Sequence, residues 1–314
     1  MKLIIIILIF NFLLSKSFAS VIENDAISSG CVSTYVALAN EVSSVLLNPA
    51  VVSKVKHNSL SFVYNKITPE VSGINFVANY KFGIVGLAGG YSSLGANDIE
   101  VYSSEKKDIY SRNFYFDCSL AISENFNLGL LGKYKNEFYG INENQNFDAS
   151  FGIHSELSKN IWLGVKIDNF ITDYMIVSGV AFRIGKLENK NLNKSNLDIE
   201  LDEPKIDIDD IDINIDDIDI EKDTKINKEI FSKFNIEIDT AWNFEIFDYI
   251  SAGFEWWISK LFAIRTGILY GIYYKNLSFG IGLSFILANK LRFDLAYRYN
   301  NIFNNYLIGT SFRY

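Results

Sequence analysis

The chain has 314 residues, a formal net charge of −8 at pH 7 and 49% hydrophobic residues. After the N-terminal leader, no stretch offers the ~18 consecutive apolar residues that a transmembrane helix needs. Aromatic residues make up 15% of the chain and Pro contributes only 3 residues. Because this composition excludes a bundle of membrane-spanning helices and favours long strands with aromatic faces, the sequence predicts an all-β protein.

The first residues have the pattern of an export signal. Lys2 supplies a positive charge, residues 3–14 are apolar, and Ser17-Phe18-Ala19 is a small-x-small cleavage site. An uncleaved anchor is the alternative, but the apolar run is shorter than the ~20 residues that span a bilayer. We therefore expect a signal peptide over residues 1–19, cleaved near Ala19, and an exported mature protein.

The segment from Ala26 to Val55 lacks the alternation of a strand. Its apolar residues recur at roughly helical spacing and predict a short helix; they are Val32, Val36, Ala39, Val42, Val45 and Leu46. Pro49 lacks a backbone donor and disfavours helical geometry at Asn48, so the helix should end before Asn48-Pro49-Ala50.

From Ser59 onward the sequence alternates with period two in segments of about ten residues, the length of a tilted strand that crosses a bilayer. In 277–285, for example, Leu, Phe and Ile alternate with Ser and Gly. Fourteen such segments are predicted, at 59–66, 74–82, 84–94, 110–122, 125–136, 147–158, 160–170, 175–185, 232–242, 247–258, 261–270, 275–287, 290–299 and 304–314. The even number suits a bacterial outer-membrane barrel.

The connections between these segments alternate in length. Tight turns are predicted near 83, 123–124, 158–159, 259–260 and 289, and longer connections around 95–109 and 137–146. Outer-membrane barrels have short periplasmic turns and longer external loops, so even-to-odd turns should face the periplasm. A soluble sandwich or barrel also alternates. However, nearly every segment here carries a full apolar face, which favours a transmembrane antiparallel β-barrel over residues 58–314.

The last segment alternates in Tyr306, Ile308, Thr310 and Phe312 up to the final residue, Tyr314. This resembles the C-terminal signal of outer-membrane barrels, whose last strand ends in an aromatic residue. The resemblance implies two partners, which are outer-membrane lipid and the barrel assembly machinery, the latter through the strand that ends at Tyr314.

An acidic insertion interrupts the barrel at 187–228, between the eighth and ninth segments. Its low complexity predicts a largely disordered periplasmic segment. A cation or a basic periplasmic partner is the alternative, through the aspartates of 197–223, although the Gly turn and terminal Glu of an EF-hand loop are missing. These aspartates are Asp207, Asp209, Asp210, Asp212, Asp216, Asp217 and Asp219.

Residues with catalytic or metal chemistry are scattered. Cys31 and Cys118 lie in dissimilar segments and are expected to be free thiols, and His57 and His154 form no metal-ligand pattern. His154 shares a face with Asp148 and Glu156, which predicts a lumenal position. Without a nucleophile–base arrangement or a nucleotide-binding fingerprint, we expect no enzyme, cofactor, metal or nucleic-acid partner.

Charged residues recur on the predicted lumenal face of the strands. Such charges can line an aqueous path, pair with one another or with a plug, or contact a substrate. They are Lys133, Lys135, Lys166, Asp168, Arg183, Glu255, Arg265, Arg292, Asp294, Arg298 and Arg313.

The N-terminal segment can now be interpreted. Gly30 to Ala50, with Val36–Glu41 at its centre and Asn48-Pro49-Ala50 at its end, resembles the signature of FadL-like outer-membrane barrels, in particular the PorV/PorQ-like branch. The resemblance implies that residues 20–57 form a hatch inside the barrel, with Asn48, Pro49 and Ala50 as hatch residues. It further implies an outer-membrane location.

Two functions follow from the resemblance. One is passive transport of small hydrophobic compounds across the outer membrane. The other is a non-transporting, partner-binding or secretion-associated role of the PorV type, with the acidic insertion as a docking arm. An apolar pocket between hatch and wall would favour transport, whereas a sealed barrel that binds partners through 197–223 would favour the second role.

Overall fold

The computed structural model describes residues 26–32, 34–38, 41–100, 106–139, 142–172, 174–185, 233–243, 246–272, 275–288, 290–301 and 304–314. The predicted signal peptide and the acidic insertion at 187–228 lie outside the described residues.

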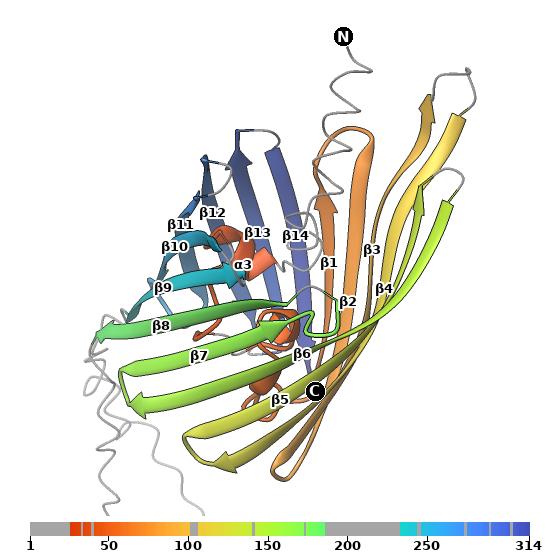
Figure 1. Cartoon of the computed structure of the whole chain (residues 1–314). Helices are drawn as coiled ribbons and strands as arrows, with labels where there is room; N and C mark the ends of the chain where they lie inside the picture. Colours follow the sequence, from red (N-terminus) through yellow and green to blue (C-terminus); the bar gives the residue numbers. More distant parts are fainter. Residues whose placement is uncertain are drawn as a thin grey trace, which may run out of the picture.

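Fourteen antiparallel strands form one closed barrel, in which each strand pairs with its neighbours in sequence and β1 pairs with β14 (Figure 1). The closing register runs from Ser59 opposite Arg313 to Lys66 opposite Tyr306. The predicted barrel and its strand number are confirmed. The strands are β1 (Ser59–Lys66), β2 (Val71–Phe82), β3 (Val85–Glu100), β4 (Lys106–Ser123), β5 (Phe126–Tyr139), β6 (Asn142–Ser158), β7 (Ile161–Asp168), β8 (Met175–Gly185), β9 (Lys233–Asn243), β10 (Ile246–Trp257), β11 (Phe262–Gly271), β12 (Asn276–Leu287), β13 (Leu291–Asn300) and β14 (Asn304–Arg313).

The outer surface of the wall is apolar and its inner surface is small or polar. On β14, the side chains of Ile308 and Phe312 are exposed to the outside, whereas Asn305 and Ser311 face inward and are buried. β12 alternates in the same way, with Phe279 outside. Because backbone groups in hydrocarbon must all be paired, a closed barrel with this outer surface is suited to lipid.

The expectation of long connections around 95–109 and 137–146 is wrong. β3 and β4 continue to pair as far as Glu100 opposite Lys106, and β5 and β6 as far as Tyr139 opposite Asn142. Cross-strand aromatic contacts support these extensions; the ring centroids of Tyr110 and Phe138, for instance, are 5.2 Å apart. Four long strands therefore extend one side of the barrel (Figure 1).

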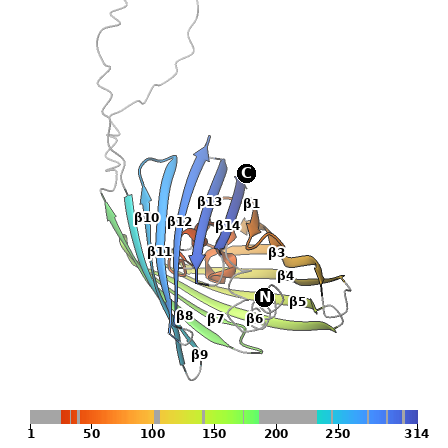
Figure 2. The same ribbon diagram turned by 90° about the horizontal axis from the view of Figure 1, so that it is seen from above.

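The N-terminal segment lies inside the ring of strands (Figure 2). We call its described residues between Ala26 and His57 the hatch. It contains one helical turn, α3 (Ala26–Gly30), and two 3₁₀ segments, η1 (Val42–Leu46) and η2 (Pro49–Val51). No helix in the described ranges has the length and apolar character to cross a membrane.

The prediction of one helix that continues to Asn48 is therefore only partly right. Val32 has a φ of 55°, a left-handed conformation that β-branched residues rarely adopt, and it follows the end of α3. The segment is rich in Ser and Val, which are weak helix formers. As described below, wall side chains also bind the backbone N–H groups that a longer helix would use internally.

Candidate functional site

An apolar contact zone joins the hatch to the wall, and we call it the seam. On the hatch side, η1, η2 and adjoining residues are buried. The wall contributes inward-facing residues from β2, β3, β4, β5, β7 and β8. The seam consists of hatch residues Val42, Val45, Leu46, Leu47, Val51 and Val52 and wall residues Val77, Ala88, Tyr115, Leu131, Trp162 and Ala181. An aqueous pore would have a polar surface here.

Glycines in the wall allow the hatch to approach very closely. A Cβ atom built on Gly129 would lie 2.3 Å from the carbonyl carbon of Pro49, and one on Gly164 would lie 2.3 Å from the carbonyl oxygen of Val36. Such distances are far below van der Waals contact, so only glycine fits. We call six such residues the glycine cradle: Gly86, Gly129, Gly152, Gly164, Gly253 and Gly267. They come from β3, β5, β6, β7, β10 and β11, so the hatch is closely packed on opposite sides of the barrel.

Asn48-Pro49-Ala50 lies inside the barrel, where Asn48 and Ala50 have no exposed surface. The Asn48 Oδ1 atom accepts a hydrogen bond from the Ala50 N–H at 3.1 Å and caps η2. Its Nδ2 group donates to the carbonyl oxygens of Val36 at 2.9 Å and of Ile153 on β6 at 3.0 Å. The Asn48 side chain thus joins two parts of the hatch to each other and the hatch to the wall.

We expect Asn48→Ala to lower the free energy of unfolding by about 2 kcal/mol, because a helix cap is lost and two buried carbonyl oxygens lose their donor. Urea denaturation in lipid vesicles measures the change. Asn144→Ala removes an exposed amide from β6 and serves as the comparison. An equal loss in both variants would contradict the bridging role of Asn48.

Two carboxylates of β9 bind four consecutive N–H groups of the hatch. Asp239 accepts from Tyr35 at 2.9 Å and Val36 at 3.3 Å, and Glu237 accepts from Ala37 and Leu38. Both carboxylates are fully buried. Four hydrogen bonds from consecutive N–H groups to two buried side chains make this a strong attachment of the hatch. The prediction of lumenal charges omitted both residues, although their alternation with the outward Ile238 is visible in the sequence.

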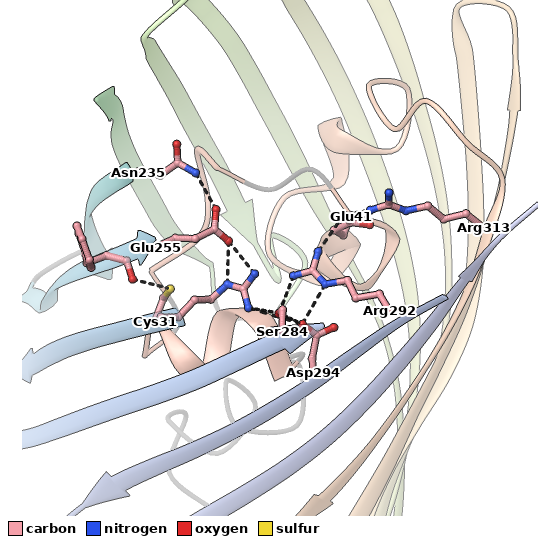
Figure 3. A network of polar contacts seen from close by, with 10 residues as sticks. Cys31, Glu41, Asn235, Glu255, Ser284, Arg292, Asp294 and Arg313 are labelled. Atoms are coloured by element: carbon pink, nitrogen blue, oxygen red, sulfur yellow. Dashed lines mark hydrogen bonds and ion pairs between the residues drawn. The ribbon is translucent and has the colours of Figure 1, made fainter. Parts of the chain in front are cut away.

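On the opposite side of the hatch, Glu41 contacts wall arginines (Figure 3). Its Oε1 atom lies 3.0 Å from Arg292 Nη1 on β13 and also contacts Arg313 on β14. Arg292 in turn pairs with Asp294 at 3.0 Å, and Ser284 on β12 bonds to both. The hatch thus has a second charged attachment, joined to a network that lies within the wall.

The same network continues along β11 and β10 in Figure 3. Arg265 pairs with Glu255 at 2.8 Å, and Asn235 on β9 donates to Glu255 at 2.7 Å. Since removing one partner of a buried ion pair leaves an uncompensated charge, these residues depend on one another. Nearby, the thiol of Cys31 lies 3.9 Å from the carbonyl oxygen of Phe254 and forms no disulfide.

A separate group of charges joins β5, β6 and β7 to the end of η1. Asp168 binds Lys133 at 2.6 Å, Lys166 at 2.9 Å and Ser150. Lys166 also donates to the Leu46 carbonyl at the end of η1, where helix carbonyl groups lack partners. The group therefore supports the hatch from a third direction.

A fourth contact involves Lys54, which follows η2. Its Nζ atom lies 3.1 Å from His154 Nε2, and the same ring atom lies 3.0 Å from the Ala37 carbonyl oxygen. Burial lowers the pKa of Lys54 to about 8. Trp162 lies beside it, with the Arg183 guanidinium 4.2 Å from the ring centroid.

The structure places the predicted lumenal charges on the inner face, and most of them pair with each other or with the hatch. Lys135, Arg183 and Arg313 are partly buried, and the remaining members of the set are buried. These are Lys133, Lys166, Asp168, Glu255, Arg265, Arg292, Asp294 and Arg298. Within the described ranges, no group of three or more His, Cys, Asp or Glu side chains is arranged to hold a metal ion. These charged contacts can hold the hatch in the barrel as a plug, and removal of the hatch would expose the apolar surface of the seam.

No family model and no curated protein matches the chain. Solved structures do. The match to the Pseudomonas putida toluene transporter TodX has a TM-score of 0.57 at 11% identity. It covers 93% of this chain and 98% of the TodX chain. The CymD monoaromatic hydrocarbon channel has a TM-score of 0.55 at 10% identity, over 91% and 95%. The match to the Ralstonia pickettii toluene transporter TbuX has a TM-score of 0.53 at 10% identity and covers 93% of this chain and 99% of the TbuX chain. The chain therefore has the barrel fold of these transport channels.

Proposed function

We propose that the protein is an outer-membrane channel for the passive passage of small hydrophobic compounds. The observation that carries this proposal is the seam, an apolar surface inside the barrel that pairs hatch residues such as Leu46 and Val51 with wall residues such as Leu131. Displacement of the hatch would expose this surface, along which an apolar molecule gains by leaving water.

The comparisons support the proposal at the level of the fold. The structures reported above are transport channels and not enzymes, and their names refer to toluene and monoaromatic hydrocarbons. The apolar outer surface of the wall supports the location in a membrane. The finer placement in the PorV/PorQ-like branch rests on the N-terminal signature alone. The partner-binding alternative rests on 197–223, outside the described residues, so no described contact favours it.

Uptake by cells tests this function. We expect cells that express the protein to take up radiolabelled p-xylene at least several-fold faster than cells without it, while uptake of glucose is unchanged because the packed hatch closes the aqueous path. A variant without residues 26–50 should raise glucose uptake, since the plug is gone. Unheated electrophoretic mobility checks that each barrel is folded. Equal p-xylene uptake with and without the wild-type protein would refute transport.

A further inference from the structure

Asp117 on β4 is a buried carboxylate without a hydrogen-bond partner. Its side chain has no exposed surface, and neither carboxylate oxygen has a partner among the described residues. Buried polar groups in folded proteins are nearly always hydrogen-bonded, and an exception needs an explanation. The wall residue therefore carries two unused acceptors.

Three other wall carboxylates that face the hatch are bonded through both oxygens, whereas Asp239 is bonded to the hatch through Oδ2 alone. Asp168 binds two lysines, Glu255 binds Arg265, and Glu237 accepts N–H groups of the hatch. The barrel thus supplies partners to charged groups that have a structural task. Asp117 differs from these residues in both its contacts and its surroundings.

The surroundings of Asp117 are the seam. In the strand register it lies between Ala88 on β3 and Leu131 on β5, both of which belong to the seam. Tyr115, two residues away on the same face, belongs to it as well, and its hydroxyl is already bonded to Asn75 at 2.6 Å. η2 packs against β4 from the lumenal side. When the hatch moves, this carboxyl group will lie beside the apolar residues of the seam.

We propose that Asp117 is a ligand-binding residue of this passage and selects small hydrophobic compounds that carry one hydrogen-bond donor, a hydroxyl or an amine. The seam contacts the apolar part of the ligand, and the Asp117 carboxyl group accepts a hydrogen bond from the ligand's hydroxyl or amine. Binding sites for small molecules combine an apolar lining with a few such polar groups. A site with an acceptor discriminates against a ligand that leaves it unpaired. The inference rests on the proposed transport of hydrophobic compounds and narrows its substrate class.

Three ligands of the same shape test the inference. p-Xylene, p-cresol and p-toluidine share a methyl-substituted ring and differ in a methyl, hydroxyl or amino group. Initial uptake of each radiolabelled compound is measured in cells with matched amounts of wild type, Asp117→Leu or Asp117→Asn, and the uptake of cells without the protein is subtracted. Asp148→Asn is the control, because Asp148 is also a buried wall carboxylate but bonds to Ala149 and Ile171, outside the hatch.

In Asp117→Leu we expect the uptake of p-cresol or p-toluidine relative to p-xylene to fall about five- to tenfold, the value of one buried hydrogen bond. Asp117→Asn keeps an acceptor, so its relative uptake should lie between those of wild type and Asp117→Leu. The control, Asp148→Asn, should match wild type. In wild type, unlabelled p-cresol should inhibit p-xylene uptake more strongly than an equal amount of unlabelled p-xylene. This competition needs no variant to fold.

The outcomes separate the two proposals. If wild type takes up no p-xylene above background, the transport function fails. If it does, but the relative uptake is the same in wild type and Asp117→Leu, or p-cresol competes no better than p-xylene, the role of Asp117 is overturned while transport stands. A loss for p-cresol alone assigns the hydroxyl class, and a loss for p-toluidine alone assigns the amine class.

Discussion

Replacing both Glu237 and Asp239 by Leu should release the hatch and open the barrel to ions. The four N–H groups of residues 35–38 lose their acceptors, and each buried donor without a partner costs about 1–3 kcal/mol. The sum is a large fraction of the stability of an ordinary domain. We therefore expect the plugged state to give way to an open one. Planar-bilayer conductance should rise from near zero in wild type to that of an open pore.

A control and a second readout make this result specific. Asp148→Leu also removes a buried wall carboxylate, but one whose contacts are with Ala149, Ile171 and Thr172. It should leave the barrel closed. Protease added to the double variant should cut within residues 34–38, a stretch that is buried in the wild-type barrel. A closed, protease-resistant double variant would show that these carboxylates do not hold the hatch.

Gly129→Ala combined with Gly152→Ala should displace Asn48-Pro49-Ala50 from the wall. The two glycines face each other in the register of β5 and β6. Their new Cβ atoms would lie 2.3 Å from the Pro49 carbonyl carbon and 2.4 Å from Asn48 Oδ1. Overpacking of this kind costs about 1–3 kcal/mol per site, and backbone atoms have little freedom to yield. We expect a lower urea midpoint and a rise in ion conductance.

The matched control is Gly132→Ala with Gly89→Ala. A Cβ atom on Gly132 would have its nearest neighbour at 4.0 Å, and one on Gly89 at 3.7 Å, which are ordinary contacts. Gly132 lies on the same strand as Gly129 but on its opposite face. If both pairs of substitutions shift the urea midpoint equally, the shift reflects the general effect of replacing Gly by Ala in a strand and not a clash with the hatch.

The alternation of the sequence was sufficient to predict the wall, because in lipid each strand must present one apolar face. β1 and β8 have the predicted bounds. The misses are at β3–β6, where Asn142–Asn146 is polar throughout and carries no period-two signal, although β6 begins at Asn142. The start of β6 is held in strand conformation by its pairing with β5, and the sequence of β6 alone does not reveal this pairing.

The contacts of the candidate site were less predictable than the positions of its residues. Strand parity put residues such as Arg265 and Asp294 on the inner face, but their pairing depends on the strand register and on the side-chain rotamers. The partners of Glu237 and Asp239 are backbone N–H groups, which every residue except proline possesses and which leave no mark in a sequence. The glycine cradle is spread over six strands, so no local pattern identifies it.

The glycine cradle also has a consequence for assembly. At wall glycines of β3, β5, β6, β7, β10 and β11 the hatch leaves no room for a Cβ atom. A short connection joins η2 to β1, the strand that closes the ring with β14. A completed ring leaves no clearance for a segment that fits so tightly. The hatch should therefore serve as a template around which the strands are arranged, present in the lumen when β1 and β14 meet.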